Sequence, residues 1–317
     1  MLNRWIVGLA VAVFMCTAAA QFPTKPIRVV VPFPAGSATD TITRILSNSV
    51  SQAVGQVLVV ENKAGADGAI AAAEVAKSPP DGYTLLMATN SPMSAVPAMK
   101  KNPPYDPVAD FTPITDIGRY TFFIVVHPSV PAKTLGELIA YARANPGKLN
   151  YATGNTTGIV SSAFFASQAQ LQLVHVPYKG EPQAMTDLVA GRVQLMFASS
   201  STSVPQVREG KLRALVTTLP RRSALLPDVP TIAEAGMPQF SVTSWAGLFG
   251  PAKMPREVTE RLNREFVAAM GRQDVQAAME RQAFALIPSS PEQLAGFVKE
   301  QMESYRRILR AAGIEPE

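Results

Sequence analysis

The feature that most constrains the fold is a strand, a tight turn and a helix start that follow one another between Lys25 and Gly55. The β-branched run 27–31 has the composition of a buried strand. The turn PFPAGS follows it, and apolar residues then recur at helical spacing as far as Gly55, where a helix would end. Ser37 and Asp40 have the spacing of a capping box, which predicts that the helix begins in this turn. This opening is typical of an α/β fold.

The start of that helix also predicts a place for an anion. A helix N-terminus leaves several backbone N–H groups without partners and carries about half a positive charge. An anion is stabilised there without any Lys or Arg side chain. Any α/β protein has turns of this kind, so the turn alone does not distinguish a binding site from an ordinary loop.

Strands and helices alternate along the rest of the chain. Strands are expected at 57–60, 83–88, 111–117, 122–126, 149–153, 174–177, 193–198, 212–217 and 242–249. Helices are expected at 69–77, 135–144, 159–171, 182–190, 255–272 and 291–312. This alternation indicates parallel sheets, whose ligands bind beyond the carboxyl ends of the strands. The polar turns PAGS, TNS, GNTTG and SSSTS all fall at such ends.

Residues 1–20 have the pattern of a cleavable signal peptide. Arg4 supplies the positive start, an apolar run occupies 5–15, and an Ala-x-Ala site precedes Gln21. The pattern predicts export to the periplasm. Cys16 is removed with the signal, so the mature chain has no cysteine, and neither disulfide nor thiolate chemistry is expected.

The charge of the chain gives no indication of nucleic-acid binding. The formal net charge falls from +5 to +4 when the signal peptide leaves, because that segment holds one Arg and no acidic residue. No block of like charges occurs, so we expect no nucleic-acid partner. With 47% apolar and 17% charged residues, the chain can bury ordinary cores.

Catalytic motifs are not evident in the sequence. His127 precedes a proline and His175 lies in an apolar strand, and with no cysteine in the mature chain we expect no metal site. No phosphate-binding or dinucleotide-binding glycine motif occurs, so no cofactor is expected. The hydroxyl-rich run 199–203 has no neighbouring His or Lys that would activate a nucleophile. An exported hydrolase is therefore a distant alternative, and we expect a protein that is not an enzyme.

Eight stretches carry a resemblance to a known family. They are FPTKPIRVVVPFPAGSATD, ENKAGADGAIAAAEVAKSPPDGYTLLMAT, VHVPYKG, DLVAGRVQLMF, GKLRALVTT, LPDVPTIAEAG, SWAGLFGPAKMP and RRILRAAGIEPE. In this order, over nearly all of the mature chain, they resemble the substrate-binding proteins of tripartite tricarboxylate transporters, the Bug family of periplasmic receptors. The resemblance implies a two-lobed periplasmic-binding-protein (Venus flytrap) fold, each lobe a mostly parallel sheet flanked by helices. A cleft between the lobes would hold one small carboxylated solute.

The resemblance also implies how the chain is divided. Lobe 1 would be discontinuous, built from 21–122 and 245–317, and lobe 2 would comprise 123–244. The chain would cross between the lobes near 120–123 and 243–247.

The candidate ligand-binding residues come from the turns that match the family. They are Phe33, Ala35, Gly36, Ser37, Asp40, Thr89, Asn90, Ser91, Thr153, Asn155, Thr156, Thr157, Tyr178, Phe197, Ser199 and Trp245. Trp245 is expected in an extended segment near a crossing, where an aromatic side chain either covers the cleft or packs between the lobes.

The sequence departs from the family pattern at three of these turns. Ala35 and Ser37 replace a proline and a glycine, and the His-Leu that follows the Gly/Ser-rich loop in the family is absent after GNTTG. After QLMF many relatives have an aspartate, where this chain has Ala198, Ser199 and Ser200. The missing aspartate removes a partner for an amine. A di- or tricarboxylate or an aromatic carboxylate is therefore favoured over an amino acid.

Two questions stay open at this stage. The expected partners are a carboxylate ligand and the subunits of a membrane transporter, but a receptor that signals to a sensor kinase would use the same closure. The four polar turns contain no Lys, Arg or His, so we expect neutral donors to hold the anion. The alternative is that Lys179, beside the VPYKG turn, pairs with the ligand.

Overall fold

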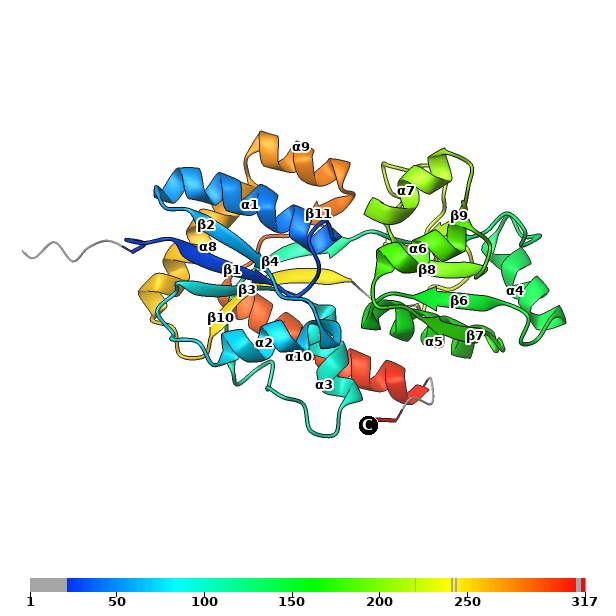
Figure 1. Cartoon of the computed structure of the whole chain (residues 1–317), viewed down its shortest axis with the longest axis horizontal. Coiled ribbons are helices and arrows are strands. Elements are labelled where there is room, and N and C mark those ends of the chain that lie inside the picture. The colour runs from blue at the N-terminus through cyan, green and yellow to red at the C-terminus, as the bar shows by residue number, and fades with distance from the viewer. Residues whose placement is uncertain (1–21, 220, 241, 243, 312–314, 317) are drawn as a thin grey trace, which may run out of the picture.

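The computed structural model describes residues 22–317 except 220, 241, 243, 312–314 and 317. Two sheets lie side by side, and each is covered by helices, so that the molecule has two lobes (Figure 1). The predicted signal peptide lies outside the described residues.

The first sheet has the strand order β11-β4-β10-β3-β1-β2. Its strands are β1 (Ile27–Val31), β2 (Leu58–Asn62), β3 (Thr84–Thr89), β4 (Phe111–Tyr120), β10 (Trp245–Pro251) and β11 (Phe284–Leu286). Strand β1 pairs in parallel with β2 and β3, whereas β10 is antiparallel to both β3 and β4. Strand β11, which the sequence pattern missed, is antiparallel to β4.

The second sheet has the strand order β7-β6-β8-β5-β9. Its strands are β5 (Phe122–Val126), β6 (Asn150–Thr153), β7 (Val174–Pro177), β8 (Leu195–Ser199) and β9 (Arg213–Thr217). Strand β6 is parallel to β7 and β8, and β5 is antiparallel to β8 and β9. The predicted two-lobed α/β fold is confirmed. Both sheets are mixed, because the strands nearest the crossings, β5 and β10, run against their neighbours.

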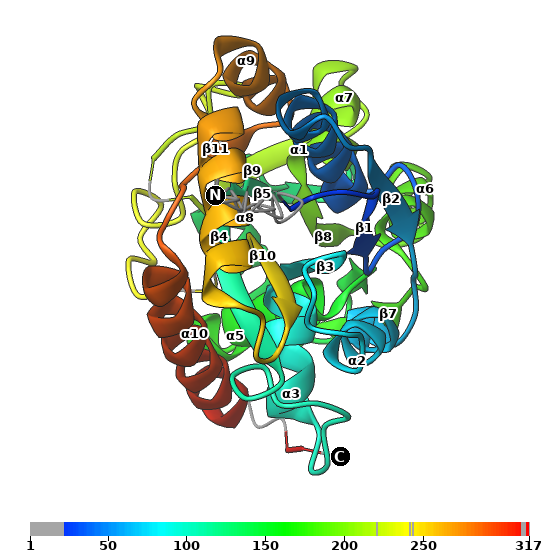
Figure 2. The same ribbon diagram turned by 90° about the vertical axis from the view of Figure 1, so that its left-hand side faces the viewer.

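Helices cover both faces of each sheet. They are α1 (Ala38–Val54), α2 (Ala69–Ala76), α3 (Val96–Met99), α4 (Leu135–Ala144), α5 (Thr156–Ala169), α6 (Glu181–Val189), α7 (Ser200–Arg208), α8 (Arg256–Met270), α9 (Gln273–Arg281) and α10 (Pro291–Ala311), with the short helices η1 (Ala66–Gly68) and η2 (Ser91–Ala95). Figures 1 and 2 show α1 and α9 on one side of the first sheet, and α2, α3 and α10 on the other. Within the described part of the chain, no helix combines the length and the apolarity that a membrane crossing requires.

The alternation of β1 places its side chains in two cores. Ile27, Val29 and Val31 pack in the core that includes α1 and α8, while Val30 packs in the core on the α2 and α10 face. All four are at most 1% exposed. A strand buried on both faces is what a continuous β-branched run predicts. Each such side chain contributes roughly 1.5–3 kcal/mol by its burial.

The chain passes from the first sheet to the second at Thr121. Strand β4 ends one residue before it and β5 begins one residue after it. The Thr121 hydroxyl donates to the carbonyl of Ala283 (2.5 Å), and its carbonyl accepts from the N–H of Ser200 (2.9 Å). The chain returns between β9 and β10, and Thr243 in the second predicted crossing lies outside the described residues. The lobe boundaries stay a prediction. Strand β5 begins at Phe122, one residue before position 123, where lobe 2 is predicted to begin.

The capping residues of α1 fix the turn that follows β1. Ser37 Oγ accepts from the N–H of Asp40 (3.2 Å), as the capping box predicts, and α1 begins at the next residue. The Asp40 carboxylate bonds to the N–H of Gly36 (2.9 Å) and to the side chains of Arg44 and Asn62. Burial raises the pKa of Asp40, but these bonds together outweigh it, so that the pKa lies below its usual value.

We expect Asp40→Asn to lower the free energy of unfolding by about 1.5–3 kcal/mol near neutral pH, because hydrogen bonds to a charged group are lost. Since the folded-state pKa of Asp40 lies below the unfolded value, its contribution is present above about pH 4 and is lost as the pH falls through the folded-state pKa. Urea unfolding of both proteins at several pH values measures this.

Asp274→Asn is the matched control, because Asp274 is exposed and bonds only to the exposed Arg272 among the described side chains. Asp274→Asn should leave the free energy of unfolding nearly unchanged, because solvent screens an exposed ion pair. A difference between wild type and Asp40→Asn that does not narrow at low pH would contradict the assigned role of the carboxylate.

Candidate functional site

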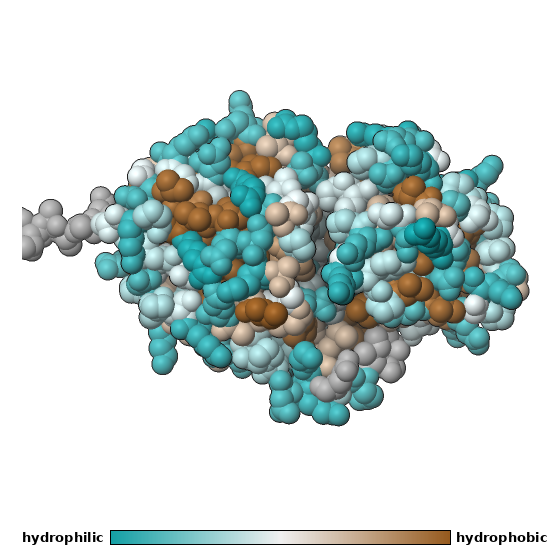
Figure 3. Space-filling model, in the orientation of Figure 1, coloured by the Kyte–Doolittle hydropathy of each residue, from teal (hydrophilic) through white to brown (hydrophobic). Residues whose placement is uncertain are grey.

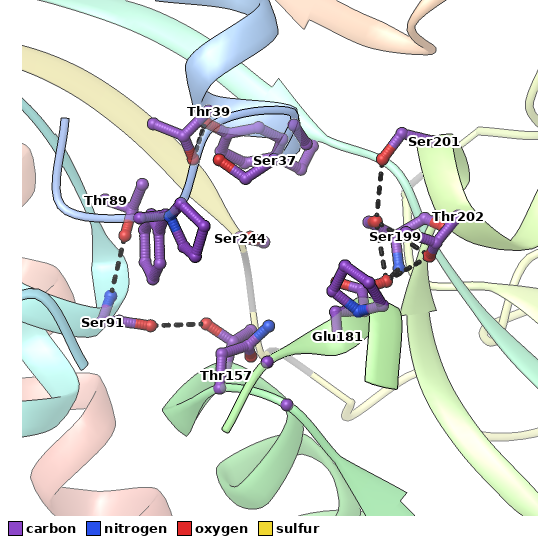
Figure 4. A pocket seen from close by; sticks show the side chains of 18 of the residues that line it. Ser37, Thr39, Thr89, Ser91, Thr157, Glu181, Ser199, Ser201, Thr202 and Ser244 are labelled. Atoms are coloured by element: carbon purple, nitrogen blue, oxygen red, sulfur yellow. Dashed lines mark hydrogen bonds between the residues drawn. The ribbon is translucent and has the colours of Figure 1, made fainter. Parts of the chain in front are cut away.

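A cleft of about 130 Å³ lies between the two lobes, where turns from both sheets meet (Figures 3 and 4). The first lobe contributes Phe33, Pro34, Ala35, Gly36, Ser37, Ala38, Thr39, Thr89, Asn90, Ser91, Tyr120 and Ser244. The second contributes Phe122, Gly154, Asn155, Thr157, Lys179, Gly180, Glu181, Pro182, Ser199, Ser201 and Thr202. The volume is below the roughly 300–1,000 Å³ of pockets for drug-sized ligands, so the cleft fits a small metabolite.

Ten of the sixteen candidate residues line this cleft. They are Phe33, Ala35, Gly36, Ser37, Thr89, Asn90, Ser91, Asn155, Thr157 and Ser199. They lie at or just beyond the carboxyl ends of β1, β3, β6 and β8. The edge of the sheet at which the sequence placed the site is therefore the edge at which the cleft lies.

Three polar candidates lie behind the lining. Asp40 points back into the turn before α1, where it bonds to Gly36. Thr153 Oγ1 lies 2.7 Å from Nε2 of His175 within the second sheet. Thr156, the first residue of α5, is 1% exposed and is not among the cleft residues. Each lies next to cleft residues in the sequence, but none of the three lines the cleft.

Three aromatic candidates are also placed elsewhere. Tyr178 donates from its hydroxyl to Asp187 (2.7 Å) on the surface of the second lobe. Phe197 is 1% exposed and stacks on Phe240 in the core. Trp245 is completely buried between helix α10 and the first sheet, with its ring against Phe297. Both alternatives for Trp245, covering the cleft and packing between the lobes, are wrong, because its ring lies in the core between the first sheet and helices α2 and α10.

Several lining residues were not among the candidates. They are Pro34, Ala38, Thr39, Tyr120, Phe122, Gly154, Gly180, Glu181, Pro182, Ser201, Thr202, Ser244 and Lys179, the last of which the sequence indicates only as an alternative partner of the ligand. Gly154 has a clear structural reason, since a Cβ on it would lie 2.2 Å from the backbone N of Glu181. Only a glycine there lets the turn after β6 touch the turn before α6. Such contacts depend on how closely two distant segments of the chain pack, and no local sequence pattern indicates them.

The first-lobe wall of the cleft is the start of α1. The N–H of Gly36 is already bonded to Asp40, and that of Ser37 to the carbonyl of Pro34 (3.2 Å). The N–H groups of Ala38 and Thr39, in the first turn, have no partner within the helix. An anion at this wall would therefore bind the helix start itself. The N–H groups of Gly36 and Ser37, in the turn before the helix, already have hydrogen-bond partners within the protein.

The floor of the cleft is formed by Asn90, which joins both lobes. Its Nδ2 donates to Thr157 Oγ1 (2.6 Å) at the start of α5 and to the hydroxyl of Tyr305 (2.5 Å) on α10. Ser91 Oγ lies 3.2 Å from the same Thr157 oxygen (Figure 4). The start of α5 is capped by Asn155, whose Oδ1 accepts from Gly158 N (2.8 Å). Two helix starts, one from each lobe, thus border the same space.

The second-lobe wall holds a carboxylate. Glu181 Oε1 accepts from the N–H (2.6 Å) and hydroxyl (2.7 Å) of Ser199 and from the hydroxyl of Thr202 (2.5 Å), at the start of α7. Burial raises the pKa of Glu181, against the effect of these bonds. The absent aspartate after β8 argued against an amine-bearing ligand. The structure corrects that argument, because α6 brings a carboxylate to the same place.

The remaining walls are apolar or exposed. Phe33, Phe122, Pro182 and the ring of Tyr120 add apolar surface to the cleft, suited to a hydrocarbon chain or ring. Lys179 lines the cleft but is exposed to solvent. Neither histidine lines it, and the described residues contain no cluster of acidic or imidazole side chains that could hold a metal ion.

The architecture is that of the periplasmic binding proteins. Two α/β lobes around a small cleft are also found in solved periplasmic binding proteins. A structure described as a periplasmic transporter, 39% identical, has a TM-score of 0.87 and covers 93% of this chain and 99% of its own. Rpa4515 of R. palustris, solved with adipate, is 32% identical with a TM-score of 0.88, and the match covers 93% of this chain and all of that one. MatC from Rhodopseudomonas palustris, solved with bound malate, is 31% identical with a TM-score of 0.83, over 91% of this chain and all of that one.

Sequence comparison identifies the family. Residues 42–314 match the Tripartite tricarboxylate transporter family receptor. The UPF0065 protein in the tcbD-tcbE intergenic region of Pseudomonas sp. (strain P51) is 39% identical over 97% of this chain and 93% of its own length. Protein BugT of Bordetella pertussis is 30% identical over 96% of each. The chain belongs to this family of solute-binding receptors, and the predicted membership of the Bug family is confirmed.

We expect Gly36→Val to abolish ligand binding. A Cβ on Gly36 meets no atom within 4 Å, so the side chain would project into the open cleft. The backbone φ of +80° adds a strain of roughly 1–2 kcal/mol for any side chain. Calorimetric titration of the folded variant with a ligand of the wild type measures the loss.

Gly55→Val separates the backbone strain of a side chain at positive φ from the steric block of the cleft. Gly55 also has a positive φ (+69°) and open space around its Cβ, but it ends α1 far from the cleft. It should show a similar loss of stability with unchanged affinity. Normal binding by Gly36→Val would move the site away from the α1 turn.

Proposed function

We propose that this protein is a periplasmic receptor that binds a small carboxylated metabolite in the cleft and delivers it to a tripartite tricarboxylate-type membrane transporter. The observation that carries the proposal is the pair of helix starts, α1 and α5, which face one cleft from different lobes. The structures of two similar proteins with adipate and with malate support the carboxylate. The signal-peptide pattern of residues 1–20 supports the periplasmic location.

A carboxylate suits these walls for electrostatic reasons. The N–H groups of Ala38 and Thr39 and the hydroxyls of Ser91 and Thr157 are donors at the edge of the cleft. Hydrogen bonds to a charged acceptor are roughly twice as strong as neutral ones. Helix ends add a favourable potential, worth about 0.3–1 kcal/mol each. The apolar surface of Phe33 and Phe122 would cover the hydrocarbon part of the ligand.

Ligand binding is coupled to the arrangement of the lobes. A ligand that touches the α1 start and the α5 start gains contacts only when the lobes are close. It therefore favours the closed arrangement by the difference between its affinities for the two states. A membrane partner that recognises the closed form would then receive only loaded receptor, which is the property that delivery requires.

A thermal-shift screen with small carboxylates tests the proposal. The panel contains adipate, malate, tricarboxylates, aromatic carboxylates and hydroxy and amino derivatives, with uncharged amides of the same skeletons as controls. A ligand at a hundredfold excess over its dissociation constant stabilises the native state by about 2.7 kcal/mol. We expect at least one carboxylate to raise the melting temperature and its amide to have no effect. If no member of the panel does so, the proposal fails.

Lys179→Met tests whether a cation holds the ligand. The side chain of Lys179 is exposed, so solvent and salt screen its charge. We expect less than a tenfold loss of affinity in calorimetry, and the same small dependence on salt in both proteins. A loss of tenfold or more, which is about 1.4 kcal/mol, would show that Lys179 is the principal partner of the anion.

A further inference from the structure

Glu181 gives the cleft two chemically different ends. Among the described residues that line the cleft it is the only acid, and Figure 4 shows it beside Ser199, Ser201 and Thr202 at the start of α7. The α1 and α5 starts, on the other walls, have no acidic side chain among the lining residues. The cleft therefore has one region that attracts an anion and one that already holds a carboxylate.

The carboxylate of Glu181 occupies the place where a second ligand anion would bind in the second lobe. Its Oε1 takes the N–H and hydroxyl of Ser199 and the hydroxyl of Thr202. These donors lie at the N-cap and in the first turn of α7, where the helix end also favours a negative charge. A second ligand carboxylate at α7 would lack these donors and would approach a group of like charge.

The other oxygen of Glu181 remains available to a ligand. No described residue donates a hydrogen bond to Oε2, and no described ion pair neutralises the carboxylate, although Lys179 lines the same cleft. The residue as a whole is only partly buried, so a ligand in the cleft can reach it. An acceptor in this position is best satisfied by an N–H or O–H group.

We propose that Glu181 determines the ligand class: a molecule with one carboxylate, held by the α1 and α5 starts, and a hydrogen-bond donor, hydroxyl or ammonium, at its far end. This inference rests on the proposed function and narrows it. Glu181 discriminates against dicarboxylates of the same length, because their second carboxylate would meet its charge. The hydroxyl and ammonium classes share this chemistry and are separated by the experiment.

The test compares three ligands of equal chain length on three proteins. The ligands are adipate, 6-hydroxyhexanoate and 6-aminohexanoate, and the proteins are wild type, Glu181→Gln and Glu209→Gln. Glutamine keeps an acceptor for Ser199 and Thr202 but removes the charge and adds an N–H₂ donor. Glu209 lies at the far end of α7, exposed and paired with Lys211, so its substitution changes the net charge equally without touching the cleft.

We expect wild type and Glu209→Gln to bind one of the two donor-bearing ligands at least tenfold more tightly than adipate in calorimetry. Glu181→Gln should lose this preference and bind adipate at least tenfold more tightly than wild type does. A preference for 6-aminohexanoate over 6-hydroxyhexanoate would identify the donor as an ammonium group, and the reverse would identify a hydroxyl.

The outcomes separate this inference from the proposed function. Binding of adipate with equal affinity by wild type and Glu181→Gln would overturn the role of Glu181 and leave a carboxylate receptor intact. Adipate binding that appears only in Glu181→Gln supports the inference. If none of the three proteins binds any carboxylate of this set or of the larger panel, both proposals are overturned.

Discussion

The contact on which the cleft depends is the hydrogen bonding of one buried amide. Asn90 is 1% exposed, and leaving such a group unpaired costs about 1–3 kcal/mol. Its nitrogen donates to Thr157 and Tyr305, and its oxygen accepts from the hydroxyl of Ser244 (3.3 Å) and the N–H of Trp245 (3.4 Å). Tyr305 and Trp245 belong to elements that pack on or form the first sheet, and Ser244 directly precedes β10 at the crossing, so Thr157 is the partner from the second lobe. A movement that separates the lobes must therefore break the Asn90–Thr157 bond or replace it with water.

The other constraint is competition for the N–H groups at helix starts. Each start can serve the protein or the ligand. At α1, Asp40 takes the N–H of Gly36, two residues before the helix, whereas at α7 Glu181 takes the N–H and hydroxyl of the N-cap Ser199 and the hydroxyl of Thr202 in the first turn. Both acids are held by the same electrostatics that would hold a ligand carboxylate. The polarity of the cleft is thus decided by which helix starts already have an internal anion.

The sequence predicted the edge of the sheets at which the cleft lies, and most of its turns. The sequence predicts strand ends at 31, 88, 153 and 198, within one residue of the observed ends, because apolar runs stop there at polar turns and both features are local. Phe197 and Trp245 were misplaced for a related reason. Alternation along a strand shows that its two faces differ, but it does not show which face meets the other lobe. That depends on how the chain crosses between the sheets, which no local pattern records.

The sequence does not identify Glu181, because the family pattern places an acidic residue after β8. This chain has Ser199 and Ser200 there, which indicates that the acid is absent. The carboxylate comes from the start of α6 instead. It can reach this place because Gly154 has no Cβ, which lets the turn after β6 pack directly against the backbone of Glu181. A cleft is built from the ends of many strands, so one chemical group can be supplied from several positions in the sequence. The fold is retained among relatives at about 30–40% identity, while the chemistry of the cleft depends on the few side chains that reach the helix starts.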